Sequence, residues 1–342
     1  MFAYGPDVIA CWWEPVQSPA NPICRLPRRV ASPRRKRVSR GTATTPETQG
    51  GIHAGSLLVK AVLLATTLLI TVGTAAAAAA TGPYVSLGDS YTAAPLVPNP
   101  TGNPILCGRS TNNYPSDVAR AIAPSAFTDA SCSSATTADM TQPQNLYNLQ
   151  TNPPQFNALG TADQLVTVGI GGNDAGLISV AEECAKLDAT TPNGTPCKDH
   201  YTAGGSDPNV AAINATGPKV ANTLQGIHSR APSARVMIVG YPDGLPTNGT
   251  ACWPLVPITK GDITYFNGLE EQLNQVIETQ AANNNASFVD TWTSSVGHDA
   301  CKPPGVAWVN GIVPTSAAFP LHPNQMGEAN MANQVLATLA AG

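Results

Sequence analysis

The sequence has little charge and few aromatic residues. Of its 342 residues, 12% are charged and 6% are Phe, Trp or Tyr, and the formal net charge is -4. A net charge this small and slightly negative argues against nucleic acid as the main partner. The sequence also lacks a Gly-x-Gly-x-x-Gly loop, a Walker phosphate loop and the Gly-x-Ser-x-Gly elbow of common α/β-hydrolases. No Cys-x-x-Cys or His-Glu-x-x-His run is present, so we expect neither a metal nor a cofactor.

The first 80 residues differ in composition from the rest. Residues 28–40 are rich in arginine, and the uncharged stretch 61–80 ends in six alanines. This pattern predicts a signal peptide over 59–80, with a retained membrane anchor as the alternative. Either reading places the chain after residue 81 outside the cytoplasm, so we expect a secreted protein, or a cell-surface protein if the segment is uncleaved. Residues 1–58 are interpreted as a non-native upstream translation, or else as a disordered cytoplasmic tail.

Six of the eight cysteines lie after the leader. An even number of cysteines in an exported chain favours three disulfides over free thiols. Six cysteines can pair in many ways, and a metal site is the alternative use for them. We expect sequential pairing, which gives Cys107–Cys132, Cys184–Cys197 and Cys252–Cys301.

Short apolar runs alternate with helical patterns along residues 81–342, which we expect to form one domain. The runs contain β-branched residues without polar alternation, as in parallel strands buried on both faces. Alternation with helices predicts an α/β sheet with helices on both sides. The expected strands are 84–88, 165–170, 235–240 and 286–289, and the expected helices are 113–123, 209–230, 260–283 and 324–340. Segments 93–112, 141–160, 184–208, 242–259 and 297–321 are rich in Pro, Gly, Asn and Thr, and we expect long loops there.

Three polar residues that could form a catalytic site lie at the ends of apolar runs or directly before a helix. Ser90 follows the first strand, Asn173 follows the Gly171–Gly172 pair after the second, and His322 precedes the last helix. Ligands bind at the carboxyl ends of parallel strands, so Ser90 and Asn173 are expected on one rim. Each residue alone has an ordinary structural reading: an N-cap serine, a Gly-Asn-Asp turn and a solvated histidine. His298 is the rival candidate for a catalytic base.

These residues carry a resemblance to a known superfamily. Gly88-Asp89-Ser90-Tyr91, the turn Gly171-x-Asn173-Asp174 and His322-Pro323-Asn324 resemble three blocks of the SGNH (GDSL) hydrolases, in the same order. The residues around Cys107, Tyr114-Pro115 and Cys132-Ser133-Ser134-Ala135 resemble the secreted actinobacterial esterase and lipase branch, which has three disulfides. The resemblance covers roughly residues 82–342. It implies a three-layer α/β/α sandwich with a parallel central sheet, the flavodoxin-like fold of that superfamily.

The resemblance also implies roles for individual residues. Ser90 would be the nucleophile and His322 its general base, and the Ser90 N–H and the Asn173 side chain would bind the oxyanion. The third oxyanion donor is usually the N–H of a glycine, and Ser134 stands there in this sequence. The aspartate that usually precedes the histidine by three residues is replaced by Phe319. We therefore predict a Ser90–His322 dyad in which the Phe319 carbonyl orients the imidazole.

The function expected from these residues is a secreted serine hydrolase that cleaves carboxylic esters, as an esterase or lipase, through an acyl-enzyme. A glycan O-deacetylase of the same fold and a catalytically weakened surface binding module are the alternatives. The expected partner is a small-molecule or lipid ester. We expect no cofactor, no nucleic acid and no obligatory protein partner, and proximity to a membrane or cell wall stays open.

Overall fold

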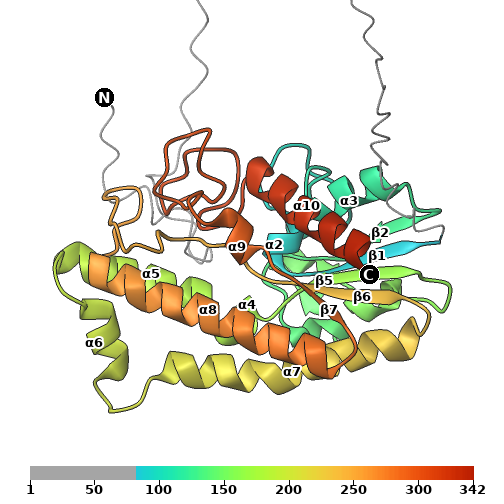
Figure 1. The fold of residues 1–342 in the computed structure, drawn as a ribbon, viewed down its shortest axis with the longest axis horizontal. Helices are drawn as coiled ribbons and strands as arrows, with labels where there is room; N and C mark the ends of the chain where they lie inside the picture. The colour runs from blue at the N-terminus through green and yellow to red at the C-terminus, as the bar shows by residue number, and fades with distance from the viewer. Residues whose placement is uncertain (1–81) are drawn as a thin grey trace, which may run out of the picture. The chain divides into compact units, whose positions relative to one another are not determined.

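Five parallel strands form the centre of the fold in a computed structural model, which describes residues 82–342 (Figure 1). The predictions for residues 1–58 and 59–80 lie outside these residues. The order across the sheet is β2 (Phe127–Asp129), β1 (Tyr84–Gly88), β5 (Leu165–Gly169), β6 (Arg235–Val239) and β7 (Ser287–Val289). A separate two-stranded hairpin joins β3 (Gln144–Asn145) and β4 (Thr151–Asn152).

The two faces of the sheet bury two different sets of side chains. Tyr84 and Met237 belong to one hydrophobic cluster, together with residues of α3 (Tyr114–Ile122) and α10 (Gln325–Ala341). Val85 and Ile238, the next residues along the same strands, belong to the other, with residues of α7 (Pro208–Arg230) and α8 (Lys260–Asn283). Side chains along a strand alternate between the two faces of the sheet, so these strands contribute residues to both hydrophobic clusters. Figure 1 shows α3 and α10 on one side of the sheet and α7 and α8 on the other, which confirms the predicted three-layer α/β/α sandwich.

Capping residues explain where three of the long helices begin. The side chains of Asn113, Asp207 and Asn324 accept backbone N–H groups from the first turns of α3, α7 and α10. Such caps satisfy donors that have no partner within the helix. All four predicted helices are present. The remaining helices are α2 (Ser90–Ala93), α4 (Gly172–Ala175), α5 (Leu177–Thr190), α6 (Pro196–Thr202) and α9 (Trp292–Ser295).

The loop predicted over residues 184–208 is wrong, because α5 extends into this segment and α6 lies within it. The reason is tertiary. The carboxylate of Asp262, on α8, accepts the backbone N–H groups of Cys197 and Lys198 in the first turn of α6. The local signal is limited to Pro196 in the first turn, because the Thr195 side chain makes no capping hydrogen bond and the capping carboxylate lies 65 residues away. Strand β2 was also missed, because its three residues Phe127–Asp129 are largely exposed and carry no apolar run.

The three predicted disulfides are confirmed: Cys107–Cys132, Cys184–Cys197 and Cys252–Cys301. The first joins the loop after α2 to the segment that follows β2. The second joins α5 to α6, and the third joins two of the long loops. No helix in residues 82–342 has the length and apolar character that crossing a bilayer requires.

The chain changes direction across the sheet at β1. After β1 it moves outward to β2, and it then returns to place β5 on the opposite side of β1. Gly88 and Gly169 are partners at the carboxyl ends of β1 and β5. Such a switch point in strand order leaves a crevice at the ends of the two strands, where ligands bind in open α/β sheets. Ser90 and Asn173 follow these two strands, so the topology places both at this crevice.

Candidate active site

Ser90 opens the short helix α2 directly after β1. Its hydroxyl does not cap the helix, because the carboxylate of Asp89 takes that position and accepts the N–H of Tyr91 at 3.0 Å. Gly88 makes the sharp entry with φ +149°, and a Cβ placed there would lie 2.2 Å from Thr92 Oγ1. Only glycine fits this turn. The reading of Ser90 as an N-cap serine is therefore wrong, and its hydroxyl is available for another partner.

That partner is His322. Its Nε2 lies 2.7 Å from Ser90 Oγ, and its Nδ1 lies 2.7 Å from the carbonyl oxygen of Pro320. A carbonyl oxygen only accepts, so Nδ1 carries the ring proton and Nε2 accepts the hydrogen bond from the serine hydroxyl. This is the geometry that general-base activation of a serine requires.

The prediction that Phe319 orients the imidazole is wrong. Its carbonyl accepts the backbone N–H of His322 at 3.2 Å, so it is directed at the main chain and not at the ring. Leu321 adopts the left-handed region, with φ +61°, and at this turn the ring bonds to the carbonyl of Pro320, two residues before the histidine. The Phe319 side chain makes an edge contact with the imidazole instead, with ring centroids 5.3 Å apart.

Burial controls the charge of the imidazole. His322 is 3% exposed, and burial lowers its pKa to about 4, although the hydrogen bond to Pro320 opposes this shift. The ring is therefore neutral at neutral pH, as a proton acceptor must be. Tyr91 supports it from the nucleophile side: its hydroxyl donates to the Leu321 carbonyl at 2.6 Å, and its ring centroid lies 4.9 Å from that of His322.

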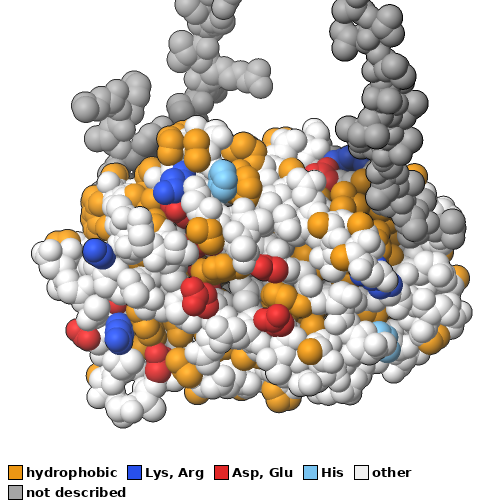
Figure 2. Space-filling view, viewed as in Figure 1, with side chains coloured by type: hydrophobic (Ala, Val, Ile, Leu, Met, Phe, Trp, Pro, Cys, Tyr) orange, Lys and Arg blue, Asp and Glu red, His pale blue; other side chains and the backbone are white. Residues whose placement is uncertain are grey.

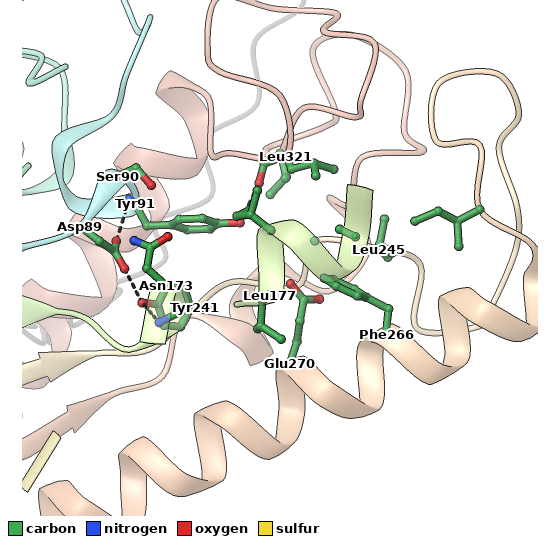
Figure 3. A pocket seen from close by; sticks show the side chains of 16 residues that line it. Asp89, Ser90, Tyr91, Asn173, Leu177, Tyr241, Leu245, Phe266, Glu270 and Leu321 are labelled. Atoms are coloured by element: carbon green, nitrogen blue, oxygen red, sulfur yellow. Dashed lines mark hydrogen bonds between the residues drawn. The ribbon is translucent and has the colours of Figure 1, made fainter. Parts of the chain in front are cut away.

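Asn173 reaches the same crevice from the end of β5. Its Nδ2 donates to the Ala135 carbonyl at 2.9 Å, which orients the amide and leaves the second Nδ2 hydrogen for another acceptor. Asn173 and Ser90 line one pocket (Figure 3). Ser134 is one residue from Ala135, in the segment that follows β2. Among the described residues, no hydrogen-bond acceptor meets the backbone N–H of Ser90 or that of Ser134.

Ser134 adopts a backbone conformation that suits glycine, with φ +64° and an exposed side chain. The left-handed conformation costs an L-residue about 1–2 kcal/mol in the folded protein. Glycine avoids this cost but raises the conformational entropy of the unfolded chain, which offsets part of the gain. We expect Ser134→Gly to raise the free energy of unfolding by roughly 0.5–1 kcal/mol, measured by urea denaturation. Ser134→Ala keeps the Cβ and should give no gain. An equal gain in both variants would contradict this explanation.

Sequence reasoning missed Tyr241, which ties the two strand ends together. Its hydroxyl accepts the N–H of Gly172 at 2.8 Å and donates to the Asp89 carboxylate at 2.5 Å (Figure 3). Burial raises the pKa of Asp89 to about 7, against the opposing effect of this hydrogen bond. The available signal was position alone, since Tyr241 follows the end of β6 on the same rim.

The pocket extends from Ser90 past Tyr91 into a largely apolar chamber. Among the lining residues, Leu177, Leu245 and Phe266 lie on the far side of Tyr91 from Ser90 in Figure 3. An apolar wall of this kind accepts hydrocarbon, because burying it removes apolar surface from water.

The rival base His298 lies elsewhere. Its ring stacks on Trp308 at 3.6 Å, and its Nδ1 contacts the Val306 carbonyl, so the structure does not bring it to Ser90. In the described part of the chain, no group of three or more His, Cys, Asp or Glu side chains could hold a metal ion.

Comparison with known proteins identifies the family. Residues 86–329 match the GDSL-like lipase/acylhydrolase family, so the chain belongs to it. Lipase 2 of Streptomyces coelicolor is 37% identical over 260 residues, which cover 75% of this chain and 85% of that protein. The crystal structure of phospholipase A1 from Streptomyces albidoflavus aligns with a TM-score of 0.60 at 27% identity, over 77% of this chain and 99% of that one. An esterase of Streptomyces scabiei is 27% identical over 293 residues, which cover 74% of this chain and 84% of that protein. The protein is a carboxylic-ester hydrolase of this family.

Proposed function

We propose that the enzyme is a secreted esterase or lipase in which Ser90 attacks the ester carbonyl and His322 is the general base. The observation that carries this proposal is the 2.7 Å contact between His322 Nε2 and Ser90 Oγ at the switch point of the sheet. The Pro320 carbonyl would hold the imidazole in the required tautomer, in place of a carboxylate. A neutral carbonyl stabilises the imidazolium less than aspartate does, which limits the rate of proton transfer.

The reaction follows from these positions. Ser90 Oγ bonds to the ester carbon while its proton passes to His322 Nε2, and the carbonyl oxygen becomes an oxyanion. The N–H groups of Ser90 and Ser134 and the Asn173 amide supply three donors for it. Collapse breaks the bond to the alcohol oxygen, which takes the proton from His322. Water then attacks the acyl-enzyme with His322 again as base, and the carboxylic acid leaves.

The pocket favours esters with an uncharged, apolar chain. Its far wall is built from Leu177, Ile178, Leu245, Ile258 and Phe266. On the face shown in Figure 2, most of the surface is uncharged and charged side chains are few. The names of the relatives, which include lipases, an esterase and a phospholipase A1, support acyl esters as the substrate class. We therefore assign the apolar chamber to the acyl chain.

The proposed compartment is outside the cytoplasm. The three disulfides support an oxidising environment. The basic and alanine-rich leader supports export.

A fluorophosphonate probe and a series of p-nitrophenyl esters test the proposed function together. We expect covalent labelling at Ser90, located by mass spectrometry of the tryptic peptides, and faster hydrolysis of medium-chain acyl esters than of acetate. The heat-denatured enzyme is the control for non-specific labelling. Absence of labelling at Ser90 would refute the proposal, whereas a strong preference for acetylated sugars would favour the glycan O-deacetylase.

Removing the Tyr241 hydroxyl tests the link between the strand ends. Tyr241→Phe leaves the Gly172 N–H and Asp89 Oδ2 each without a partner, and both flank the reacting groups. We expect kcat to fall by about tenfold, since an unsatisfied buried group costs about 1–3 kcal/mol. Tyr265→Phe, which breaks hydrogen bonds to Asp207 and Asn209 instead, is the matched control and should retain kcat. Equal kcat losses in the two variants would contradict a local effect.

A further inference from the structure

Glu270 places a carboxyl group in the apolar chamber, and the mechanism above does not use it. It projects from α8, and Figure 3 shows its carboxyl between Leu177 and Phe266. The residue is 6% exposed, and its Oε2 has no hydrogen-bond partner among the described residues. A buried polar atom without a partner destabilises the fold. An unpaired carboxyl that faces a substrate pocket therefore points to a partner supplied by the substrate.

The surroundings of this carboxyl favour its uncharged form. No salt bridge of the described residues involves Glu270, and the charged groups near it are the carboxylates of Asp243 and Glu271. Asp243 is itself buried beside Asp299, and the phenol of Tyr91 also faces Glu270. Burial first, and then Asp243, raise the pKa of Glu270 well above its usual range. The raised pKa favours the protonated form, which can donate one O–H as well as accept a hydrogen bond.

The loop after β6 packs closely against one side of this carboxyl. A Cβ at Gly244 would be 3.3 Å from Glu270 Oε1, so glycine avoids a tight contact there. Oε2 is the oxygen that lacks a partner. Tyr91 lies between Ser90 and Glu270 in Figure 3. A group bound at Glu270 therefore lies beyond Tyr91 from the ester carbon at Ser90.

We propose that Glu270 forms a polar subsite that donates a hydrogen bond to an oxygen atom within the acyl chain, at some distance from the scissile ester. This inference rests on the proposed function and narrows its substrate class. An ether, hydroxyl or second ester oxygen in the chain would satisfy the carboxyl. A plain hydrocarbon chain displaces water and leaves the carboxyl unpaired. A site built to hydrogen-bond one group discriminates against analogues that lack it.

Matched substrates test the subsite in the full-length enzyme. We would measure kcat/KM for p-nitrophenyl alkanoates and for analogues in which one CH₂ is replaced by oxygen, at each position from the fourth chain atom onward. We expect the wild type to prefer one oxygen-containing ester over its alkanoate by about threefold to tenfold, the value of a single hydrogen bond. Glu270→Gln keeps a donor and should keep the preference, whereas Glu270→Leu should lose it and cleave alkanoates faster.

Glu278→Leu is the matched control, because Glu278 lies further along α8, is exposed and does not line the pocket. It should keep the wild-type preference. Fluorophosphonate labelling of Ser90 reports whether each variant is folded. The same ratio of oxygen-containing to plain esters in the wild type and Glu270→Leu would overturn the subsite. No turnover of any ester by the wild type would overturn the proposed function, and the subsite with it.

Discussion

Ser90→Ala and His322→Ala are each expected to lower kcat for ester hydrolysis by about 10⁴-fold or more. The two groups work as a unit, so removal of either one leaves only binding and oxyanion stabilisation. The double variant should be no slower than the slower single variant. The measurement is the steady-state hydrolysis of a p-nitrophenyl ester, together with covalent labelling by a fluorophosphonate.

His298→Ala is the control for the base, because His298 stacks on Trp308 away from Ser90. It should retain kcat within about threefold, a change too small for loss of a general base. Ser229→Ala, at an exposed site on α7, is the control for the nucleophile. Retention of activity by Ser90→Ala would contradict the assigned role of Ser90. A kcat loss in His298→Ala as large as that in His322→Ala would contradict the assigned base.

Asn173→Ala is expected to lower kcat by about 10²–10³-fold with little change in KM, the effect of removing one oxyanion donor. The reason is that the amide contributes most when negative charge develops on the carbonyl oxygen. Asn173 also donates to the Ala135 carbonyl, so the free energy of unfolding is measured for each variant to separate a structural effect from a catalytic one. Asn222→Ala, at an exposed site on α7, is the matched control. If KM rises and kcat is retained, Asn173 binds substrate and does not stabilise the oxyanion.

The strands and long helices were predictable because their signals are local. Runs such as Leu165–Gly169 are apolar and β-branched, and Asn324 precedes the last helix as a cap. The segments that failed depend on distant partners: α6 is capped by Asp262 of α8, and β2 is defined by its pairing with β1. The backbone hydrogen bonds between β1 and β2 do not depend on side-chain type, so the sequence of β2 gives little indication of its pairing.

The residues of the candidate site also differ in how far the sequence alone predicts them. Ser90, Asn173 and His322 were expected from short motifs and strand ends, and the structure brings Ser90 to His322 and places Ser90 and Asn173 in the lining of one pocket. The orienting carbonyl was placed on Phe319 and belongs to Pro320, because one left-handed residue at Leu321 redirects the turn. Carbonyl groups are present at every position, so only the path of the chain decides which one faces the ring. Tyr241 and Glu270 follow from tertiary packing alone.

The hydroxyl of Tyr241 joins groups that follow three different strands, namely its own β6, Asp89 after β1 and Gly172 after β5. The phenol thus links the strand ends from which Ser90 and Asn173 project, and Gln155 of the loop 141–160 adds hydrogen bonds to the Gly88 backbone. Substitutions in the apolar wall of the pocket, at Leu177, Ile178 or Phe266, can alter which esters enter without touching these links. This arrangement lets substrate preference diverge among descendants of one fold while the chemistry is inherited unchanged.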